Sequence, residues 1–299
     1  MFQVGDKGEY IMLVCPVCGA VYENSLNMVC GRCGFFPQNK NGIIIWPNKS
    51  KEINYPVDAF DVLENNENEY FWFKSRAELI VQLIEKYFKN VKNIYDMGCG
   101  TGYILSVLEK RFSKIELYGS DIFIESLTFA KKKLSNNVKL MLIDAYAMPF
   151  LNEFDLILSC DVLEHLSEDK YILEKLYESA RPGGGLIITV PQHMWLWSKA
   201  DDDAGHVRRY SKSELQEKII SAGWNVVYSS SFVSLLLPAV MASRLINKSD
   251  NRQEKEFSIT PWINNLFYRI ASMERTMIHA GIKFPFGSSL VFIAQKKDR

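Results

Sequence analysis

The chain has 299 residues, of which 47% are hydrophobic, so it can hold one large domain with a real core and a smaller domain. Its 35 basic and 35 acidic residues cancel, and this balance gives no bulk preference for a polyanion such as nucleic acid. The first ten residues lack the apolar core of a secretory signal, and the longest apolar run, 235–242, is far shorter than the roughly 20 residues that span a bilayer. We therefore expect a globular, cytoplasmic protein.

Four of the six cysteines form two Cys-x-x-Cys pairs near the N-terminus, Cys15 with Cys18 and Cys30 with Cys33. Four thiolates complete a tetrahedral shell around one zinc ion, and a closed shell of this kind indicates a structural metal. Because residues 1–47 hold few apolar side chains, we expect zinc to supply the stability of this segment. Two redox pairs are the alternative, which is disfavoured because neither pair opens a helix of a thioredoxin-like unit.

From residue 90 onward, short apolar runs alternate with helical patterns, which predicts a parallel sheet built of βα units. The predicted helices include 103–112, 124–134 and 170–180, the last stopped by Arg181-Pro182-Gly183. The fold class is thus α/β, a seven-stranded doubly wound, Rossmann-like sheet in a domain of residues 48–299, with a helical insertion at 231–288 before the last strand. We predict strands at 93–97, 116–120, 138–143, 154–159, 185–190, 224–229 and 289–295.

A glycine-rich loop follows the first of these strands and opens a helix. Gly98, Gly100 and Gly102 stand at alternate positions after Asp96, and glycines there allow a ligand to lie against the main chain. The helix start beyond them offers unpaired N–H groups to an anionic group. The loop therefore indicates a nucleotide-cofactor site. A nicotinamide site is disfavoured because its Gly-x-Gly-x-x-Gly pattern places the third glycine one residue later.

Further carboxylates stand at the ends of the next three strands, where open parallel sheets bind their ligands. Asp121 is placed to accept both hydroxyls of a ribose, and Asp144 can accept a hydrogen bond from an adenine amine, with Ala145 leaving room for the ring. Asp161 follows the fourth strand. Each acid alone could cap a helix. Four such acids in succession, counting Asp96, favour a cofactor site.

The segments 96–102 and 154–166, together with Asp121 and Asp144-Ala145, resemble the class I S-adenosylmethionine-dependent methyltransferases over roughly two-thirds of the chain. Arg76, on the helix before the first strand, resembles by position an arginine that pairs with the cofactor's carboxylate, although plain packing is the alternative. The resemblance implies that Asp161 flanks the sulfonium. It also implies a cofactor site that comprises Arg76, Asp96, Gly98, Gly100, Gly102, Asp121, Ile122, Asp144, Ala145 and Asp161.

The cysteine-rich segment, 13–45, resembles the small zinc ribbons that accompany several methyltransferases, either fused or as activating subunits. The resemblance leaves two roles open for it. Such a ribbon either contacts RNA or braces the catalytic domain.

Three histidines follow the fourth and fifth strands, on the side where a methyl acceptor should enter. We predict that His206 is the base or the residue that orients the acceptor, and that His165 is a second candidate for the base, or a loop-orienting residue. The segment 191–210 resembles the acceptor-side lid of methyltransferases that act on small molecules, sugars or lipid-linked intermediates. Alternatively, its arginines pair with Asp201–Asp203 and hold the lid. We predict that the acceptor pocket is shaped by His193, Trp197 and Arg208.

We therefore predict methyl transfer from S-adenosylmethionine to a small-molecule, saccharide or lipid-linked acceptor, at oxygen. An RNA methyltransferase that grips RNA with the ribbon is one alternative, although nucleic acid is disfavoured by the neutral charge. A non-catalytic cofactor-binding scaffold is another. The apolar arm 231–245 must be covered, and the sequence leaves open core packing, a homodimer, an apolar substrate tail or the membrane surface.

Overall fold

The structure is a computed structural model that describes residues 11–24, 28–47, 59–246 and 259–298. The first ten residues, for which the sequence analysis expects no secretory signal, lie outside the described residues. Within the described ranges, no helix is both long enough and apolar enough to cross a membrane.

A nine-stranded sheet runs through the described part of the chain in the order β10-β11-β9-β8-β5-β6-β7-β4-β3. The strands β7, β6, β5, β8 and β9 are parallel, and β11 lies antiparallel between β9 and β10. All seven predicted strands are present, which confirms the predicted doubly wound α/β fold. The chain moves outward from β5 to β7 and then returns to β8 beside β5, so the strand order reverses at β5 and β8. These seven strands are β5 (Asn93–Met97), β6 (Glu116–Asp121), β7 (Lys139–Leu142), β8 (Phe154–Cys160), β9 (Ala180–Pro191), β10 (Asn225–Phe232) and β11 (Ser289–Gln295).

Strand β9 differs most from its predicted bounds, because it begins at Ala180 and the prediction began at residue 185. The predicted stop does end the preceding helix at Ser179. The chain then continues directly into the sheet, where Ala180 pairs with Phe154 of β8 across a register shift. Pro182 is tolerated there because the irregular start of the strand does not need its missing N–H donor.

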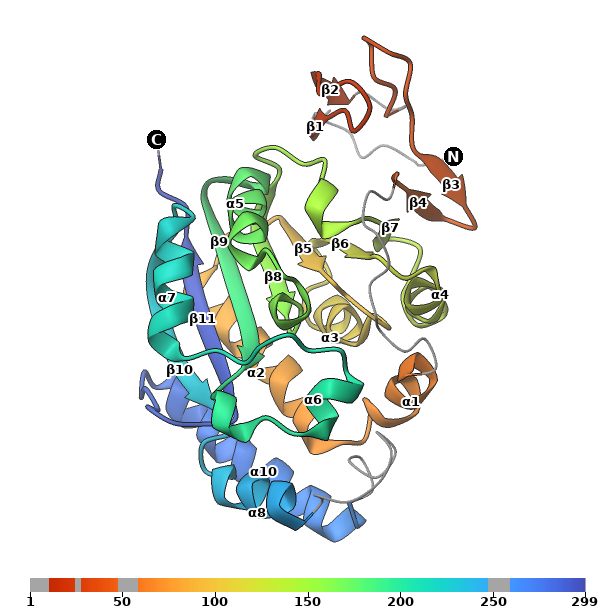
Figure 1. Cartoon of the computed structure of the whole chain (residues 1–299). Helices are drawn as coiled ribbons and strands as arrows, with labels where there is room; N and C mark the ends of the chain where they lie inside the picture. The colour runs from red at the N-terminus through yellow and green to blue at the C-terminus, as the bar shows by residue number, and fades with distance from the viewer. Residues whose placement is uncertain (1–10, 25–27, 48–58, 247–258, 299) are drawn as a thin grey trace.

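Helices cover both faces of the sheet (Figure 1). Neighbouring residues of a strand point to opposite faces, and accordingly Ile94 packs into one hydrophobic core and Tyr95 into the other. The first core includes residues of α2, α3, α4 and α10, and the second includes residues of α5 and α7. The helices are α1 (Ala59–Asn66), α2 (Phe71–Tyr87), α3 (Tyr103–Arg111), α4 (Ile124–Lys133), α5 (Asp169–Ser179), α6 (Lys199–Asp203), α7 (Lys212–Ser221), α8 (Leu237–Ile246) and α10 (Pro261–His279), with short 3-10 turns η1 (Ala145–Ala147), η2 (Leu163–His165) and η3 (Met194–Leu196).

The cysteine-rich segment is joined to the main sheet by backbone hydrogen bonds. Its hairpin of β1 (Ile11–Val14) and β2 (Val21–Asn24) contacts the chain after η1, where the Val14 N–H donates to the Pro149 carbonyl over 2.7 Å. Its second hairpin, β3 (Gln38–Lys40) and β4 (Ile43–Ile45), extends the sheet because β4 pairs in parallel with β7. Figure 1 shows both hairpins at this edge of the molecule.

The insertion between β10 and β11 is a helical layer at the other end of the molecule (Figure 1). α10 packs along α2, and the carboxylate of Glu274 on α10 accepts hydrogen bonds from the backbone N–H groups of Ser234 and Leu235. These bonds hold the chain that leads into α8. The apolar arm is therefore anchored to the main domain through α10, which packs on α2.

Candidate functional site

A cavity of about 810 Å³ lies at the carboxyl ends of β5, β6, β7 and β8, which is where the strand order reverses. Its volume lies in the upper range of ligand pockets, with room for more than one small molecule. Most of the predicted site residues line it, from both the cofactor side and the acceptor side. They are Arg76, Asp96, Gly98, Gly100, Asp121, Ile122, Asp144, Ala145, Asp161, His165 and His206.

The glycine loop between β5 and α3 forms the floor of the cavity. Gly98 has a φ of +76°, and a Cβ there would lie 2.4 Å from Cγ2 of Val162, so this position has no room for a side chain. Gly100 has a φ of +54°, but a Cβ there would meet nothing within 4 Å. The space over Gly100 therefore belongs to the cavity. Gly102, which does not line the cavity, is the N-cap of α3 and packs closely against Ala130 of α4.

Asp121, at the end of β6, ties the loop to the neighbouring strand. Its Oδ2 accepts a hydrogen bond from the Gly100 N–H over 2.9 Å, and its Oδ1 accepts one from the Phe123 N–H over 3.0 Å. Burial raises the pKa of Asp121, while these two backbone donors oppose the shift. The carboxylate is thus held in a fixed orientation at the cavity wall.

Asp96, near the end of β5, carries a buried carboxylate. It is 1% exposed, and neither oxygen has a hydrogen-bond partner among the residues that the structure describes. Burial raises its pKa to about 7; the charge of Arg76 opposes the shift and that of Asp121 adds to it. A buried carboxylate of this kind is costly by itself, and a cationic ligand group in the cavity would relieve the cost.

Asp144 performs the capping role that the sequence left open. It is the N-cap of η1, and its Oδ1 accepts a hydrogen bond from the Tyr146 N–H over 2.9 Å. Asp144 and Ala145 also line the cavity. They follow β7, whereas Asp161 follows β8, and these two strands lie on opposite sides of β5 and its glycine loop. Capping and ligand binding are compatible, because a carboxylate has two oxygens.

Arg76 and Asp161 form an ion pair at the cavity wall, so the structure brings together two residues that the sequence predicts for different parts of the cofactor. The guanidinium also lies over the ring of Trp72, with 4.3 Å from Cζ to the ring centroid. Asp161 has a φ of +57°, which is a strained conformation for a residue with a side chain. The pKa of Arg76 is raised by Asp161 although burial lowers it. The pair is therefore a fixed polar feature of the cavity.

His165 and His206 meet on the acceptor side, with ring centroids 4.8 Å apart. The carboxylate of Glu164 lies beside them, with its Oε1 3.9 Å from Nε2 of His206. Glu164 is 0% exposed, and its carboxylate has no hydrogen-bond partner within the described ranges. Burial raises the pKa of Glu164 well above its ordinary value. Burial, together with the charge of His206, lowers the pKa of His165 to about 4, so this imidazole is neutral at pH 7. Sequence reasoning missed Glu164 as a site residue, although its position beside His165 was the available signal.

Asp201 orients His206, and this residue was also missed as part of the site. Its Oδ1 lies 2.9 Å from Nδ1 of His206 and accepts a hydrogen bond from Nε of Arg209 over 2.7 Å. Burial raises the pKa of Asp201, but the hydrogen bond with His206 and the charge of Arg209 outweigh it and lower this pKa to about 2. The predicted alternative for the lid, in which an arginine pairs with the acidic run at 201–203, is present in the Arg209 pair.

The three predicted acceptor-pocket residues do not line the cavity. The ring of His193 stacks on Trp195, with centroids 5.0 Å apart. The indole N–H of Trp197 donates to Asp202 over 3.0 Å. Arg208 pairs with Asp169 at 2.6 Å, which holds the lid to α5. In this structure these side chains support the lid from outside the cavity, and their predicted contact with the acceptor stays a prediction.

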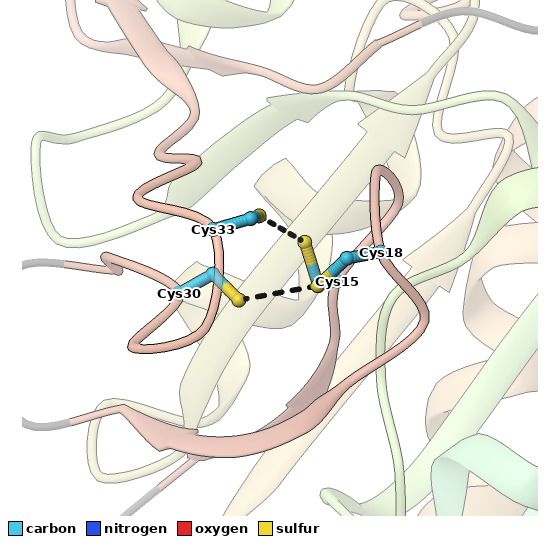
Figure 2. A group of neighbouring side chains, drawn as sticks. All are labelled: Cys15, Cys18, Cys30 and Cys33. Atoms are coloured by element: carbon cyan, nitrogen blue, oxygen red, sulfur yellow. Dashed lines mark hydrogen bonds between the residues drawn. The ribbon is translucent and has the colours of Figure 1, made fainter.

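The four cysteines of the ribbon converge on one point (Figure 2). The Sγ atoms of Cys15 and Cys33 lie 3.5 Å apart, and those of Cys18 and Cys30 lie 3.6 Å apart. A tetrahedral zinc–thiolate shell with bonds of about 2.3 Å places its sulfurs about 3.8 Å apart. All four sulfurs lie within 4.8 Å of one another, so the cluster fits a single zinc ion.

The doubly wound sheet and the cavity at its carboxyl edge are the arrangement expected of a methyltransferase domain. Residues 95–188 match the family described as "Methyltransferase domain". This match covers the glycine loop, Asp121, Asp144 and the segment around Asp161. Residues 95–188 are thus a methyltransferase domain, in agreement with the resemblance that the sequence shows.

Among curated proteins, the chain is similar to the malonyl-[acyl-carrier protein] O-methyltransferase of Priestia megaterium. The two are 31% identical over 118 residues, which cover 39% of this chain and 43% of that protein. The chain therefore spans less than half the length of this relative.

Among solved structures, the chain is similar to a methyltransferase of Haloferax volcanii in complex with the Trm112 methyltransferase activator, with a TM-score of 0.57 and 18% identity over 83% of this chain and 99% of that one. It is also similar to the phosphoethanolamine N-methyltransferase 2 of Haemonchus contortus in complex with S-adenosyl-L-methionine, with a TM-score of 0.55 and 14% identity over 85% of this chain and 62% of that one. At these identities the likeness concerns the fold.

Proposed function

We propose that this protein binds S-adenosylmethionine over the glycine loop and transfers its methyl group to an oxygen of a small-molecule, saccharide or lipid-linked acceptor. The cofactor supplies an electrophilic methyl group on a sulfonium. The contribution of the protein is to align the acceptor, exclude water and receive a proton.

The observation that carries the proposal is the set of carboxylates around Gly100. Asp121, fixed by the Gly100 N–H, is oriented to accept the ribose hydroxyls. Asp96, buried and without a partner among the described residues, suits the ammonium of the methionine moiety. Asp144 and Ala145 would meet the adenine. Arg76 and Asp161 would lie near the methionine carboxylate and the sulfonium.

The acceptor would enter between the histidine pair and the insertion. His206, oriented by Asp201, is the base or the group that orients the acceptor, and His165 stands beside it. From the other side the cavity is lined by apolar residues of the arm before and within α8, which suits an acceptor with an apolar part. They are Val233, Leu236, Ala239 and Val240. A homodimer and a membrane contact through residues 231–245 stay predictions, as does a cytoplasmic location.

We further propose that the cysteine cluster holds structural zinc and braces the edge of the catalytic sheet. The pairing of β4 with β7 and the contact of β1 with the chain at residues 149–151 support this role. Binding of RNA by the ribbon would be an alternative, and a steep loss of RNA affinity with added salt would support it.

Calorimetry with S-adenosylhomocysteine tests the cofactor site. Asp121→Ala should weaken binding at least ~10-fold, because it removes both the ribose acceptor and the anchor of Gly100. Asp61→Ala, an exposed change on α1 outside the cavity, is the matched control and should bind like wild type. An unchanged affinity of Asp121→Ala would refute the proposed cofactor site.

The acceptor class is tested by incubating cell extracts with the protein and methyl-labelled cofactor, followed by mass spectrometry. A labelled saccharide, lipid or small hydroxylated molecule is the expected result. Label found only in RNA would overturn the acceptor class, and an absence of any turnover would favour a cofactor-binding scaffold.

A further inference from the structure

The acceptor side of the cavity holds a group of possible ligand atoms that methyl transfer by itself does not require. Glu164, His165 and His206 each direct one oxygen or nitrogen to a common region, and these atoms all lie within 4.8 Å of one another. All three residues line the cavity. We propose that Glu164, His165 and His206 bind a divalent transition-metal ion, such as Mn²⁺, to which a hydroxyl of the acceptor also binds.

The first argument is the state of Glu164. It stands on the η2 turn directly after β8, it is 0% exposed, and neither carboxylate oxygen has a hydrogen-bond partner in the part of the chain that the structure describes. The nearest cationic candidate is Nε2 of His206, which lies 3.9 Å from Oε1, beyond hydrogen-bond distance. A buried carboxylate is stable when it is paired or coordinates a metal. A cation at this point would supply the partner that the Glu164 carboxylate lacks among the described residues.

The second argument is the orientation of the two imidazoles. Nδ1 of His206 is hydrogen-bonded to Asp201, so Nε2 is directed toward Glu164. A carboxylate behind a histidine is the arrangement that fixes the tautomer and the ring orientation of metal-binding histidines. His165 is likewise hydrogen-bonded to a neighbour, the backbone of Gly205. Asp201 itself is held by Arg209, so the support of His206 extends through a second ion pair.

The third argument is the ligand set and its spacing. Two imidazoles and one carboxylate suit first-row divalent metals and leave further positions open for water or substrate. Two adjacent ligands on an ion with bonds of about 2.1 Å lie about 3 Å apart. The separation of 3.9 Å between His206 and Glu164 is wider by less than the length of one bond, and small rotations of the two side chains close it.

The position of this ion would be useful for methyl transfer. A hydroxyl that binds a divalent cation loses its proton more readily. With the ion in place, His206 would orient the acceptor through the metal and would not serve as the base, so the proton would go to water. The oxygen would form its bond to the methyl carbon as the carbon–sulfur bond breaks and sulfur keeps the electron pair. This part of the inference, and with it the preference for a hydroxylated acceptor, rests on the proposed function. The binding of the ion does not.

The test is titration of Mn²⁺ into the full chain loaded with zinc, with free Mn²⁺ measured by electron paramagnetic resonance. Wild type should bind one Mn²⁺. Glu164→Gln, which keeps the shape of the side chain but removes the charge, should weaken binding at least ~10-fold, and His206→Ala should do the same. His279→Ala is the matched control, because His279 is exposed at the end of α10, outside the cavity.

Affinities for S-adenosylhomocysteine, measured on the same samples, separate the two proposals. If wild type binds S-adenosylhomocysteine but no Mn²⁺, or if Glu164→Gln and His206→Ala bind Mn²⁺ as wild type does, the metal site is refuted and the methyltransferase proposal stands. If Mn²⁺ binds as expected but S-adenosylhomocysteine does not, the proposed function fails and the ion site stands. Circular dichroism of each variant verifies that it is folded.

Discussion

The Gly100 N–H donates a hydrogen bond to Oδ2 of Asp121 over 2.9 Å, and this bond joins two segments that stand 21 positions apart in the chain. The glycine loop and the acid of the next strand are therefore one rigid unit. The open space over Gly100 lies beside the fixed carboxylate, so a ligand that occupies this space also meets Asp121.

The two glycines of this loop should respond differently to the same substitution. Gly98→Ala should destabilise the fold, because its methyl group would lie 2.4 Å from Val162 and its φ of +76° costs an alanine about 1–2 kcal/mol. Gly100→Ala has the φ cost but no clash, so it should fold better and yet lose affinity for S-adenosylhomocysteine. Thermal unfolding and calorimetry of both variants test this contrast. Equal stability of the two would contradict the packing, and wild-type affinity of Gly100→Ala would contradict the ligand position.

Asp96→Asn should make the free protein more stable at pH 8. The pKa of Asp96 is raised from 3.8 to about 7, so the folded state binds more protons than the unfolded state between these values. The contribution of protonated Asp96 to the free energy of unfolding is fully present below pH 3.8 and is lost as the pH rises through about 7. The total loss is at most ~4 kcal/mol. The variant removes this cost.

The measurement for Asp96 is urea unfolding of both proteins at several pH values. The advantage of Asp96→Asn should grow from pH 4 to pH 8, and its affinity for S-adenosylhomocysteine should fall because the ammonium loses its partner. A stability difference that does not change with pH would show that Asp96 is not an unpaired carboxylate.

Arg76→Lys should weaken binding of S-adenosylhomocysteine despite the conserved charge. The planar guanidinium is paired with Asp161 and lies over Trp72, and lysine cannot reproduce this geometry. We expect a loss of about 1–2 kcal/mol in calorimetry. Arg111→Lys is the control, because Arg111 forms an exposed pair with Glu85 on the surface. Equal affinities of the two variants would argue that Arg76 only packs.

Cys15→Ser should release zinc and lower the Tm of the protein. Cys15 is buried and its Sγ lies 3.5 Å from that of Cys33, so its loss opens the shell of four thiolates. Metal analysis by mass spectrometry and a thermal melt measure the two effects. Val17→Ser, an exposed change in the same loop, should keep its zinc. An unchanged zinc content in Cys15→Ser would exclude the proposed shell.

The sequence predicts the central fold well because the apolar strand patterns and the glycine loop are both local features of the sequence. Apolar strand patterns gave β5 and β11 with their observed bounds, and the glycine loop with its neighbouring acids pointed to the carboxyl edge of the sheet. The start of β9 was predicted too late because Pro182 and Gly183 usually stop regular structure, whereas here the chain turns directly from α5 into the strand.

Long-range contacts could not be predicted from local patterns. The pairing of Arg76 with Asp161 joins positions 85 residues apart, and nothing in either segment specifies the other. Glu164 was not predicted as a site residue, because the distance of 3.9 Å between its Oε1 and Nε2 of His206 depends on the fold. The arginines of the lid are a further example. Their proximity in the sequence to Asp201–Asp203 suggested that both Arg208 and Arg209 pair with these acids, but Arg208 pairs with Asp169 of α5.

The pairing of β4 with β7 bears on how the chain could be shortened. Residues 43–45 pair with β7 through backbone hydrogen bonds. Without them, β7 would be the edge strand of the parallel sheet, with unpaired backbone groups. A chain that began after these residues would present β7 to solvent, and an unpaired strand of this kind readily recruits another copy. The cysteine-rich segment is thus unsuited to removal as a detachable module, and truncation before residue 48 should turn a well-behaved protein into one that self-associates.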